Sequence, residues 1–451
     1  MVHRIDEALR HIQHDLAKYF EPTTIFKLCR DARYHWRRRL LDPVTTIHLF
    51  VLQILHGNTA CSHLPHLTKK RFTPSAYCQA RARLPLKIFQ KLLNNVGQAL
   101  EAVTDQAEHW RGHRVFLLDG SGFSMPDTPE LQKEFGQPSA QKPGCGFPVA
   151  HMLLLFHAGT GLLRQVLTAP LRTHDMSRAS AMHPELREDD VLVGDRGFCS
   201  FAHWALLFLR NMHALFRAHQ NVLIDFTPFR PHVETGKGKK APKGTPRSRW
   251  LGHFAATDQV VEWFKPEQRP AWMTAEQYAS LPAFLVLREL RYRIGRAGFR
   301  TQEITLVTTL LDPEKYPARA LAELYGMRWR VETNLANLKR TMKMDVLRCE
   351  TVAGVQKELT MFALVYNLVR VVMLEAARRQ GVDVERISFI DALRWLSTAT
   401  PGEEFPLLIV NPHRPNRVEP RLTKRRPKEY RWLMKPRQIA RNELLAQPVE
   451  A

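Results

Sequence analysis

Residues 115–120 (Val-Phe-Leu-Leu-Asp-Gly) and 190–197 (Asp-Val-Leu-Val-Gly-Asp-Arg-Gly) are two short apolar runs, and each ends in an aspartate at a turn. Short apolar runs bounded by turn residues predict buried β-strands. A helical pattern follows the second run over residues 200–210. Strands followed by helices, with polar residues at the strand ends, predict an α/β architecture in which helices cover a sheet.

The pattern extends on both sides of these runs. Residues 1–105 are typical of helices, whereas residues 221–300 combine a basic Gly- and Pro-containing loop (230–249) with strand-like runs. This change predicts a β-rich insertion in the core. The predicted strands are 115–118, 151–157, 162–167, 190–194, 214–217, 260–264, 284–293 and 304–309, and the predicted helices are 5–19, 45–55, 75–85, 200–210, 315–345 and 353–380.

Two aspartates, Asp119 and Asp195, directly follow predicted strands. Functional side chains in an open α/β sheet gather where strands end. The two carboxylates therefore point into one crevice if their strands are neighbours. An aspartate before a glycine also caps an ordinary turn, and for a single Asp-Gly pair that interpretation is the stronger one. The aspartates alone leave both interpretations open.

The helix predicted over residues 315–345 carries a third acidic candidate, Glu332, together with Tyr325, Arg328 and Lys339. At about 100° per residue, these four side chains fall within roughly 60° of one another on the helix surface. One carboxylate beside a phenol and two cations suits a metal ion and phosphate together. A salt-bridged surface helix fits as well, because Arg328 and Glu332 are an i,i+4 pair.

The same helix carries a resemblance to a known family. The segment Tyr325-Gly-Met-Arg-Trp-Arg-Val-Glu332, followed by Lys339, matches the spacing Tyr-x2-Arg-x3-Glu-x6-Lys without a gap. It resembles the Asp-Asp-Glu insertion-sequence transposases of insertion-sequence-four type, which are named for this Tyr-Arg-Glu-Lys motif. Their first aspartate lies in an Asp-Gly motif, as Asp119 does, and their second in an Asp-Arg-Gly-Phe/Tyr motif, as Asp195 does. The resemblance covers roughly residues 110–380.

The resemblance implies an RNase H-like catalytic core with an inserted β-rich subdomain, preceded by a helical N-terminal domain. The implied parts are a helical DNA-binding domain (1–105), a first core part (106–220), the β-rich insertion (221–300), a second core part with the catalytic helix (301–385) and a basic C-terminal region (386–451).

The resemblance also implies a DNA transposase that binds the terminal repeats of its element, cleaves DNA and joins 3′ ends to target DNA. Asp119, Asp195 and Glu332 would be its catalytic residues and metal ligands. Carboxylates supply the hard oxygen atoms that Mg²⁺ or Mn²⁺ prefers, and two such ions would serve cleavage and joining.

The implied DNA contacts lie on the same helix and in the N-terminal region. Trp329 fits either a core position or a DNA contact. The resemblance implies that a tryptophan of the insertion holds an extruded base, and the candidates are Trp250, Trp263 and Trp272. The helix predicted at 75–85, with Ser75 as its cap, fits either a recognition helix or a solvated one. The candidate DNA-binding residues are Tyr325, Arg328, Trp329, Lys339, Arg81 and Arg83.

The charge of the chain favours a polyanionic partner. Its 451 residues include 66 Lys and Arg against 44 Asp and Glu, a formal net charge of +22. An excess of this size attracts nucleic acid. We therefore expect double-stranded DNA as the partner, both element ends and target, and joining two ends in one event favours a homodimer on DNA.

Compartment and membrane association can also be predicted. The six cysteines form no CxxC pair, which argues against a zinc ribbon and favours a reduced compartment. The most apolar run, residues 361–377, contains Asn367, Arg370 and Glu375 and predicts a buried helix instead of a membrane span. We expect a cytoplasmic, nucleoid-associated bacterial protein without a membrane partner.

Three alternatives stay open. A DNA nuclease on the same core would share the triad and cut without joining. A catalytically silent DNA-binding relic would keep the motifs. A basic RNA- or ribosome-associated protein would account for the charge but not for the three acidic residues.

Overall fold

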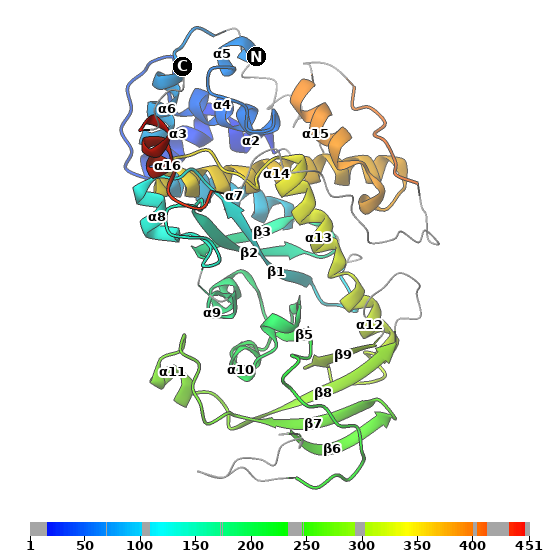
Figure 1. Ribbon diagram of the computed structural model, residues 1–451. Helices are drawn as coiled ribbons and strands as arrows, with labels where there is room; N and C mark the ends of the chain where they lie inside the picture. The colour runs from blue at the N-terminus through cyan, green and yellow to red at the C-terminus, as the bar shows by residue number, and fades with distance from the viewer. Residues whose placement is uncertain are drawn as a thin grey trace.

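The structure is a computed structural model that describes residues 16–68, 70–101, 109–171, 173, 175–232, 246, 248–293, 303–399, 404–412 and 433–446. Figure 1 shows a cap of N-terminal helices, one long helix beneath the cap, and a sheet that continues to the opposite end of the molecule. Most of the helix predicted at 5–19, most of the basic loop at 230–249 and much of the C-terminal region lie outside the described residues.

Helices make up the cap. The third of them, α4, begins where the Asp42 carboxylate accepts a hydrogen bond from the backbone N–H of Thr45, which is the usual way of satisfying a free donor at a helix start. Helix α6 begins at Pro74 with Thr73 as its cap, so the predicted start at Ser75 was one residue late. The helices are α2 (Ala17–Phe20), α3 (Pro22–Asp31), α4 (Pro43–Leu55), α5 (Leu64–Thr68), α6 (Pro74–Arg83) and α7 (Leu86–Glu101).

The strands form one mixed nine-stranded sheet in the order β3-β2-β1-β4-β5-β9-β8-β7-β6. Strands β1, β4 and β5 are parallel neighbours, and the remaining pairs are antiparallel. The mixed α/β class predicted from the sequence is confirmed. The strands are β1 (Val115–Ser124), β2 (Val149–His157), β3 (Leu163–Pro170), β4 (Val191–Gly194), β5 (His213–Arg217), β6 (Ser248–Ala255), β7 (Asp258–Phe264), β8 (Phe284–Arg293) and β9 (Glu303–Thr308).

The strands of the predicted insertion do not form a separate sheet. Strand β9 pairs with β5 on one side and with β8 on the other, so the meander of β6, β7 and β8 extends the core sheet. The predicted strands at 260–264 and 284–293 are confirmed, whereas β6 was not predicted. Its residues alternate between apolar and polar only weakly, and a basic loop precedes them.

Both faces of the sheet are covered, as the alternation of side chains along β1 shows. Val115 and Leu117 pack in the cluster that contains α7, α14 and the N-terminal helices, whereas Phe116 and Leu118 pack in the cluster around α10. Successive side chains of a strand point to opposite faces. Both faces of β1 are therefore core, which explains its unbroken apolar run. The segments that connect the strands are α8 (Pro129–Phe135), α9 (Asp175–Ala179), η2 (Ser180–Glu185), η3 (Arg196–Phe198), α10 (Phe201–Phe208) and α11 (Ala275–Ala279).

The prediction of one continuous helix over residues 315–345 is wrong. It consists of α12 (Ala318–Gly326), α13 (Trp329–Ala336) and the π-turn η4 (Asn337–Thr341). The π-turn closes with a bond from the Met342 N–H to the Asn337 carbonyl, and Lys343 follows in a left-handed conformation. Single π-turns within helices occur frequently at functional sites.

The long helix α14 (Val352–Gln380) forms the centre of the molecule, between the cap and the sheet (Figure 1). Among the described residues it is the one helix whose length and hydropathy match a membrane span, and 94% of its most apolar window is buried inside the protein. Its polar residues have partners: Asn367 bonds to the backbone of Leu163, and Arg370 bonds to the Thr160 carbonyl and to Glu385. The C-terminal elements are η5 (Val384–Arg386), α15 (Phe389–Thr398) and α16 (Arg437–Leu445).

Candidate active site

The sheet places Asp119 and Asp195 side by side. Strands β1 and β4 run parallel with Leu118 opposite Gly194, and the two aspartates are the next residues of each chain. Neighbouring strands lie about 4.8 Å apart. Asp119 does not end its strand as predicted, because β1 continues to Ser124 in its pairing with β2. What ends just before Asp119 is the pairing with β4, whose last pair is Leu118 with Gly194.

Helix α13 brings Glu332 to the same face. Asp119 shares its face of β1 with Leu117, and Leu117 packs in the same core cluster as Tyr325 and Val331. The guanidinium of Arg328 lies between the two acids. Its Nη1 is 3.9 Å from Asp119 Oδ2, and its Nη2 is 3.4 Å from Glu332 Oε1.

The charges in this site are unbalanced. Burial raises the pKa of Asp119 to about 6; the Gly120 N–H and Arg328 oppose the rise, whereas the negative charges of Asp195 and Glu332 add to it. The three carboxylates therefore influence one another through space. A positive ion among them would remove the repulsion, and carboxylate oxygens are the atoms that Mg²⁺ and Mn²⁺ prefer. The donor set thus fits a divalent cation.

Two further residues of the motif surround Arg328. Tyr325 is buried, its pKa is raised by this burial, and its ring centroid lies 5.8 Å from the guanidinium carbon. Trp329 lies 5.2 Å from the same carbon and is 37% exposed, so the interpretation of Trp329 as a core residue was wrong. Arg328 Nε is buried and has no hydrogen-bond partner among the described residues. An anion would satisfy this donor.

Lys339 is bound to strand β1. Its Nζ donates to Gly122 O at 2.6 Å and to Ser121 Oγ at 3.1 Å. Lys339 thus contacts β1, and Arg328 lies beside Asp119 of the same strand, although the helix predicted to carry the motif on one continuous face is broken. The ammonium group nevertheless has protein partners that the sequence did not suggest.

The two arginines of α6 have different environments. The Arg81 guanidinium bonds to Gln53 Oε1 and Cys349 Sγ and lies over the ring of Phe50. It therefore joins α6 to α4 and to the segment before α14. The prediction that α6 presents Arg81 on its surface is wrong. Arg83 is exposed and bonds to Gln79.

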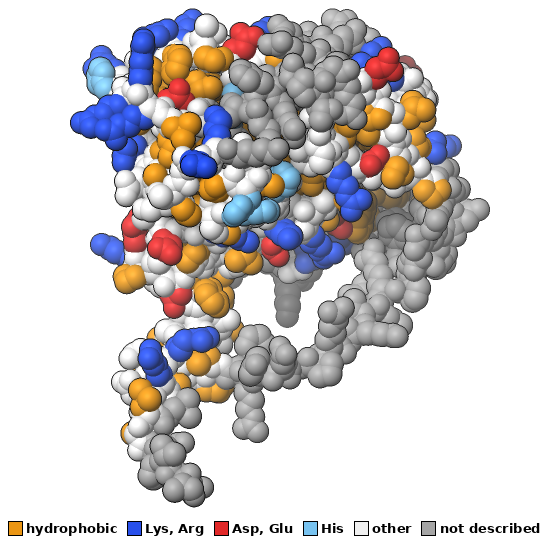
Figure 2. Space-filling model, turned by 90° about the horizontal axis from the view of Figure 1, so that it is seen from above, with side chains coloured by type: hydrophobic (Ala, Val, Ile, Leu, Met, Phe, Trp, Pro, Cys, Tyr) orange, Lys and Arg blue, Asp and Glu red, His pale blue; other side chains and the backbone are white. Residues whose placement is uncertain are grey.

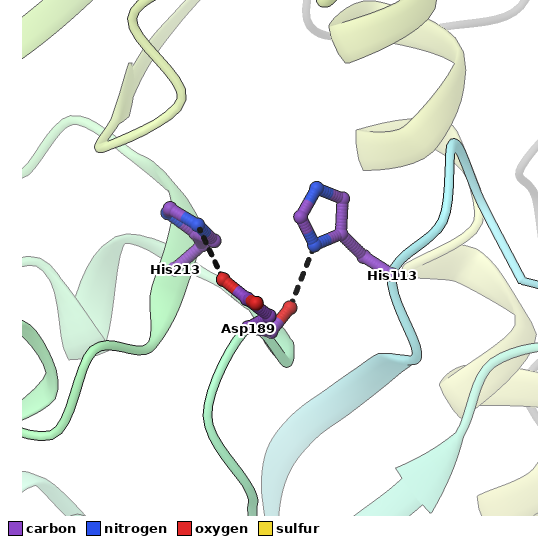
Figure 3. Close-up of side chains that lie close together, drawn as sticks. All are labelled: His113, Asp189 and His213. Atoms are coloured by element: carbon purple, nitrogen blue, oxygen red, sulfur yellow. Dashed lines mark hydrogen bonds and ion pairs between the residues drawn. The ribbon is translucent and has the colours of Figure 1, made fainter.

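A different polar cluster lies at the N-terminal ends of the central strands β1, β4 and β5. Among the described residues, one group of His, Cys, Asp or Glu side chains brings its possible ligand atoms within 4.8 Å of one another, namely His113, Asp189 and His213 (Figure 3). They stand at or before the starts of β1, β4 and β5, whereas Asp119 and Asp195 stand at the other end of the β1–β4 pairing.

Hydrogen bonds account for this cluster without a metal. His113 uses both ring nitrogens, Nδ1 with the Asp189 carbonyl at 2.7 Å and Nε2 with the Tyr316 hydroxyl at 2.6 Å. By the same 4.8 Å measure, Asp119, Asp195 and Glu332 are spread more widely than one compact ligand set. The negative charges of Asp195 and Glu332 nevertheless act on Asp119.

One residue near the site was not anticipated. Arg217 is the last residue of β5, and its positive charge acts on Tyr325 together with that of Arg328. Its position at the end of a parallel strand is the signal that could have identified it, because the two aspartates were found in the same way.

Comparison with known proteins gives consistent results. The family model described as "Transposase DDE domain" matches residues 110–368. The transposase InsG for insertion sequence element IS4 of Escherichia coli (strain K12) is 25% identical over 377 residues, which are 79% of this chain and 78% of that protein. "Putative transposase InsZ" of the same organism is 28% identical over 229 residues, 50% of this chain and 70% of that protein.

A cryo-EM structure of a piggyBac transposase synaptic complex with hairpin DNA aligns over 88% of this chain and 78% of that one, with a TM-score of 0.39 and 11% identity.

Proposed function

The chain belongs to the transposases with a DDE domain, of IS4 type, and on that premise we propose that Asp119, Asp195 and Glu332 are its catalytic acids. The protein is a DNA transposase, and its family depends on divalent metal ions. The observation that carries the assignment is the register of β1 and β4, which sets Asp119 beside Asp195 on the face where α13 holds Glu332.

The metal in this proposal is Mg²⁺ or Mn²⁺, bound as two ions by the three carboxylates. Bound divalent ions would activate the attacking oxygen and stabilise the leaving oxygen of a phosphodiester. Burial is the main cause that raises the pKa of Asp119 to about 6, and a bound cation would favour its charged carboxylate.

The remaining residues of the motif would hold the DNA backbone. Arg328 has an unpartnered Nε beside the carboxylates, which suits a phosphate next to the scissile bond. Tyr325, as a neutral buried phenol, can donate its hydroxyl hydrogen to a phosphate oxygen. Trp329 exposes part of its ring beside Arg328 and is placed to stack on a base. Lys339 has three ammonium hydrogens and uses two of them within the protein.

The proposed domain organisation assigns each residue range of the chain to one part of the transposase. The strand order β3-β2-β1-β4-β5, in which three strands pair antiparallel and two further strands are added in parallel, supports an RNase H-like core built from residues 106–220 and 301–385. Residues 221–300 would be its insertion, 1–105 the helical DNA-binding domain and 386–451 the basic C-terminal region. The transposase would act as a homodimer on element ends and target DNA, in the bacterial cytoplasm.

The cap of helices is the proposed docking surface for the element ends. Figure 2 views the molecule from above, onto this cap, and Lys and Arg side chains are spread over it. Exposed cations in this part of the chain include Arg37, Arg38, Arg39, Arg71 and Arg83. Neutralising phosphates with such residues gives salt-dependent binding without sequence preference, so Arg83 would add affinity more than specificity.

A cleavage and strand-transfer assay tests the function. Linear DNA that carries the element's terminal repeats is incubated with protein and Mg²⁺ or Mn²⁺, and cut and joined products are separated on a gel. The wild-type protein should cut and join, whereas Asp119→Asn and Asp195→Asn should do neither and still bind DNA. Equal activity of either variant would remove that aspartate from the site.

A second substrate distinguishes a transposase from the alternative, a nuclease on the same core. Precut ends with a free 3′-hydroxyl need no cleavage and report joining alone. Joined product from precut ends establishes transposition, whereas cutting of intact DNA without any joining favours the nuclease.

A further inference from the structure

Lys339 joins two elements that each carry part of the proposed site. Its Nζ donates to Ser121 Oγ and Gly122 O on β1, the strand of Asp119, and Lys339 itself lies in η4, which directly continues the helix of Glu332. Ser121 points to the same face as Asp119, because side chains two residues apart in a strand share a face.

The Lys339 contact is the second place where the helix segment and β1 are joined, after the contacts of Arg328 with Asp119 and Glu332. From Glu332 to Lys339 a helix rises about 10 Å, and from Asp119 to Gly122 a strand advances about 10 Å. Strand and helix therefore advance by similar lengths. Asp119 and Glu332 both lie beside Arg328 at one end, and the Lys339 ammonium group joins the two elements at the other end. Beyond it, the Ser124 N–H donates to the Asp345 carbonyl, and the Leu347 N–H donates to the Ser124 carbonyl.

We propose that Lys339 is a positioning residue, which holds the strand of Asp119 against the helix of Glu332 and so sets the spacing of the metal-binding carboxylates before any DNA arrives. This inference rests on the proposed catalytic triad. It adds a role to a phosphate contact, because the third ammonium hydrogen stays available for DNA.

A positioning role for Lys339 and a phosphate-contact role predict different effects on metal affinity. A lysine that only holds DNA affects DNA affinity and leaves the affinity of the free protein for metal unchanged. A lysine that sets the carboxylate spacing affects metal affinity in the absence of DNA. Residues that orient metal ligands typically change metal affinity by 10- to 100-fold when replaced. Because Lys339 acts on the strand and the backbone contacts of Ser124 remain, we expect the low end, about tenfold.

The experiment measures Mn²⁺ binding to the full-length, DNA-free protein by isothermal titration calorimetry. Lys339→Met removes the ammonium group and keeps most of the aliphatic chain, and Lys339→Arg keeps charge and donors as a conservative rescue. Arg340→Ala is the matched control, since Arg340 is an exposed cation of the same π-turn. Thermal melting of each variant shows that it is folded. Asp119→Asn reports on the site itself.

The expected result is about tenfold weaker Mn²⁺ binding by Lys339→Met, partial recovery in Lys339→Arg and no change in Arg340→Ala. If Lys339→Met binds Mn²⁺ as tightly as the wild type and only its DNA affinity falls, the positioning role is overturned and Lys339 is a phosphate contact. If Asp119→Asn also binds Mn²⁺ like the wild type, the proposed triad fails instead, and the two failures are thereby distinguished.

Discussion

Replacing Glu332 with Gln separates the chemistry of the site from its stability. The Glu332 carboxylate is 51% exposed and bonds to Arg328 over 3.4 Å. Exposed i,i+4 ion pairs contribute about 0.3–0.5 kcal/mol, so the melting temperature should fall by less than about 2 °C. Cleavage should fall by more than about 100-fold, because a charged metal ligand is lost and not merely a residue that supports one. DNA affinity should hold or rise slightly, since one negative charge near phosphate is removed.

The assay follows three quantities on the same preparations: melting temperature, DNA affinity by fluorescence anisotropy, and the single-turnover cleavage rate in Mg²⁺. Glu323→Gln is the matched control, because Glu323 forms an i,i+4 pair with Arg319 on α12 and is 64% exposed. The control removes the same group from the same kind of pair outside the site. It should lower the melting temperature by the same small amount and leave DNA affinity and the cleavage rate unchanged.

A cleavage rate of Glu332→Gln near that of the wild type would refute the reasoning. The bond between Arg328 and Glu332 would then be an ordinary surface ion pair, and the assignment of the α13 face to the active site would have to be withdrawn. A large drop in melting temperature would also contradict it, because the exposure of the carboxylate allows no such contribution.

Three further predictions test the electrostatics and the packing. Arg328→Met should bind Mn²⁺ more tightly than the wild type in calorimetry and DNA less tightly, because a guanidinium 3.9 Å from Asp119 competes with a metal ion; weaker Mn²⁺ binding would show that the arginine supports the site instead. Arg81→Ala should lose about 2 kcal/mol of unfolding free energy in urea, since bonds to Gln53 and Cys349 are removed, whereas Arg83→Ala should change it by less than about 0.5 kcal/mol. Burial lowers the pKa of His203 to about 4, below its unfolded value near 6.5. Stability should therefore be lost as pH falls from about 6.5 to about 4, by roughly 3 kcal/mol in all, and urea titrations in which His203→Gln loses as much as the wild type would contradict this source.

The positions of Arg328 and Lys339 suggest different tasks for the two cations of the motif. Arg328 lies among the carboxylates and has an unsatisfied Nε, so its partners can change when phosphate arrives. Lys339 has short bonds to β1 and is placed to keep its partners. The two measurements of Mn²⁺ affinity should therefore move in opposite directions, upward for Arg328→Met and downward for Lys339→Met.

Local pattern was enough to predict most of the sheet and the acidic residues. The strands around Val115, Val191, Val260 and Phe284 were predicted because buried strands leave continuous apolar runs, and turn residues mark where they end. Asp119 and Asp195 follow such runs, and the spacing of Tyr325 to Lys339 is a property of the chain alone. The proposal that these residues form one site came from the family resemblance that the motif carries, because strand ends and helix spacing by themselves left ordinary turns and a surface ion pair equally open.

Contacts between distant parts of the chain decided the rest. The register of Leu118 with Gly194 sets the aspartates side by side, and no local pattern specifies which strands pair. The break between α12 and α13 and the π-turn at Asn337 are absent from the helical periodicity of the sequence, and Lys339 of the π-turn bonds to β1. Arg81 turns inward because Cys349, far along the chain, supplies a partner. Lys339 meets Gly122 across 217 residues of sequence, and only the folded chain brings the two together.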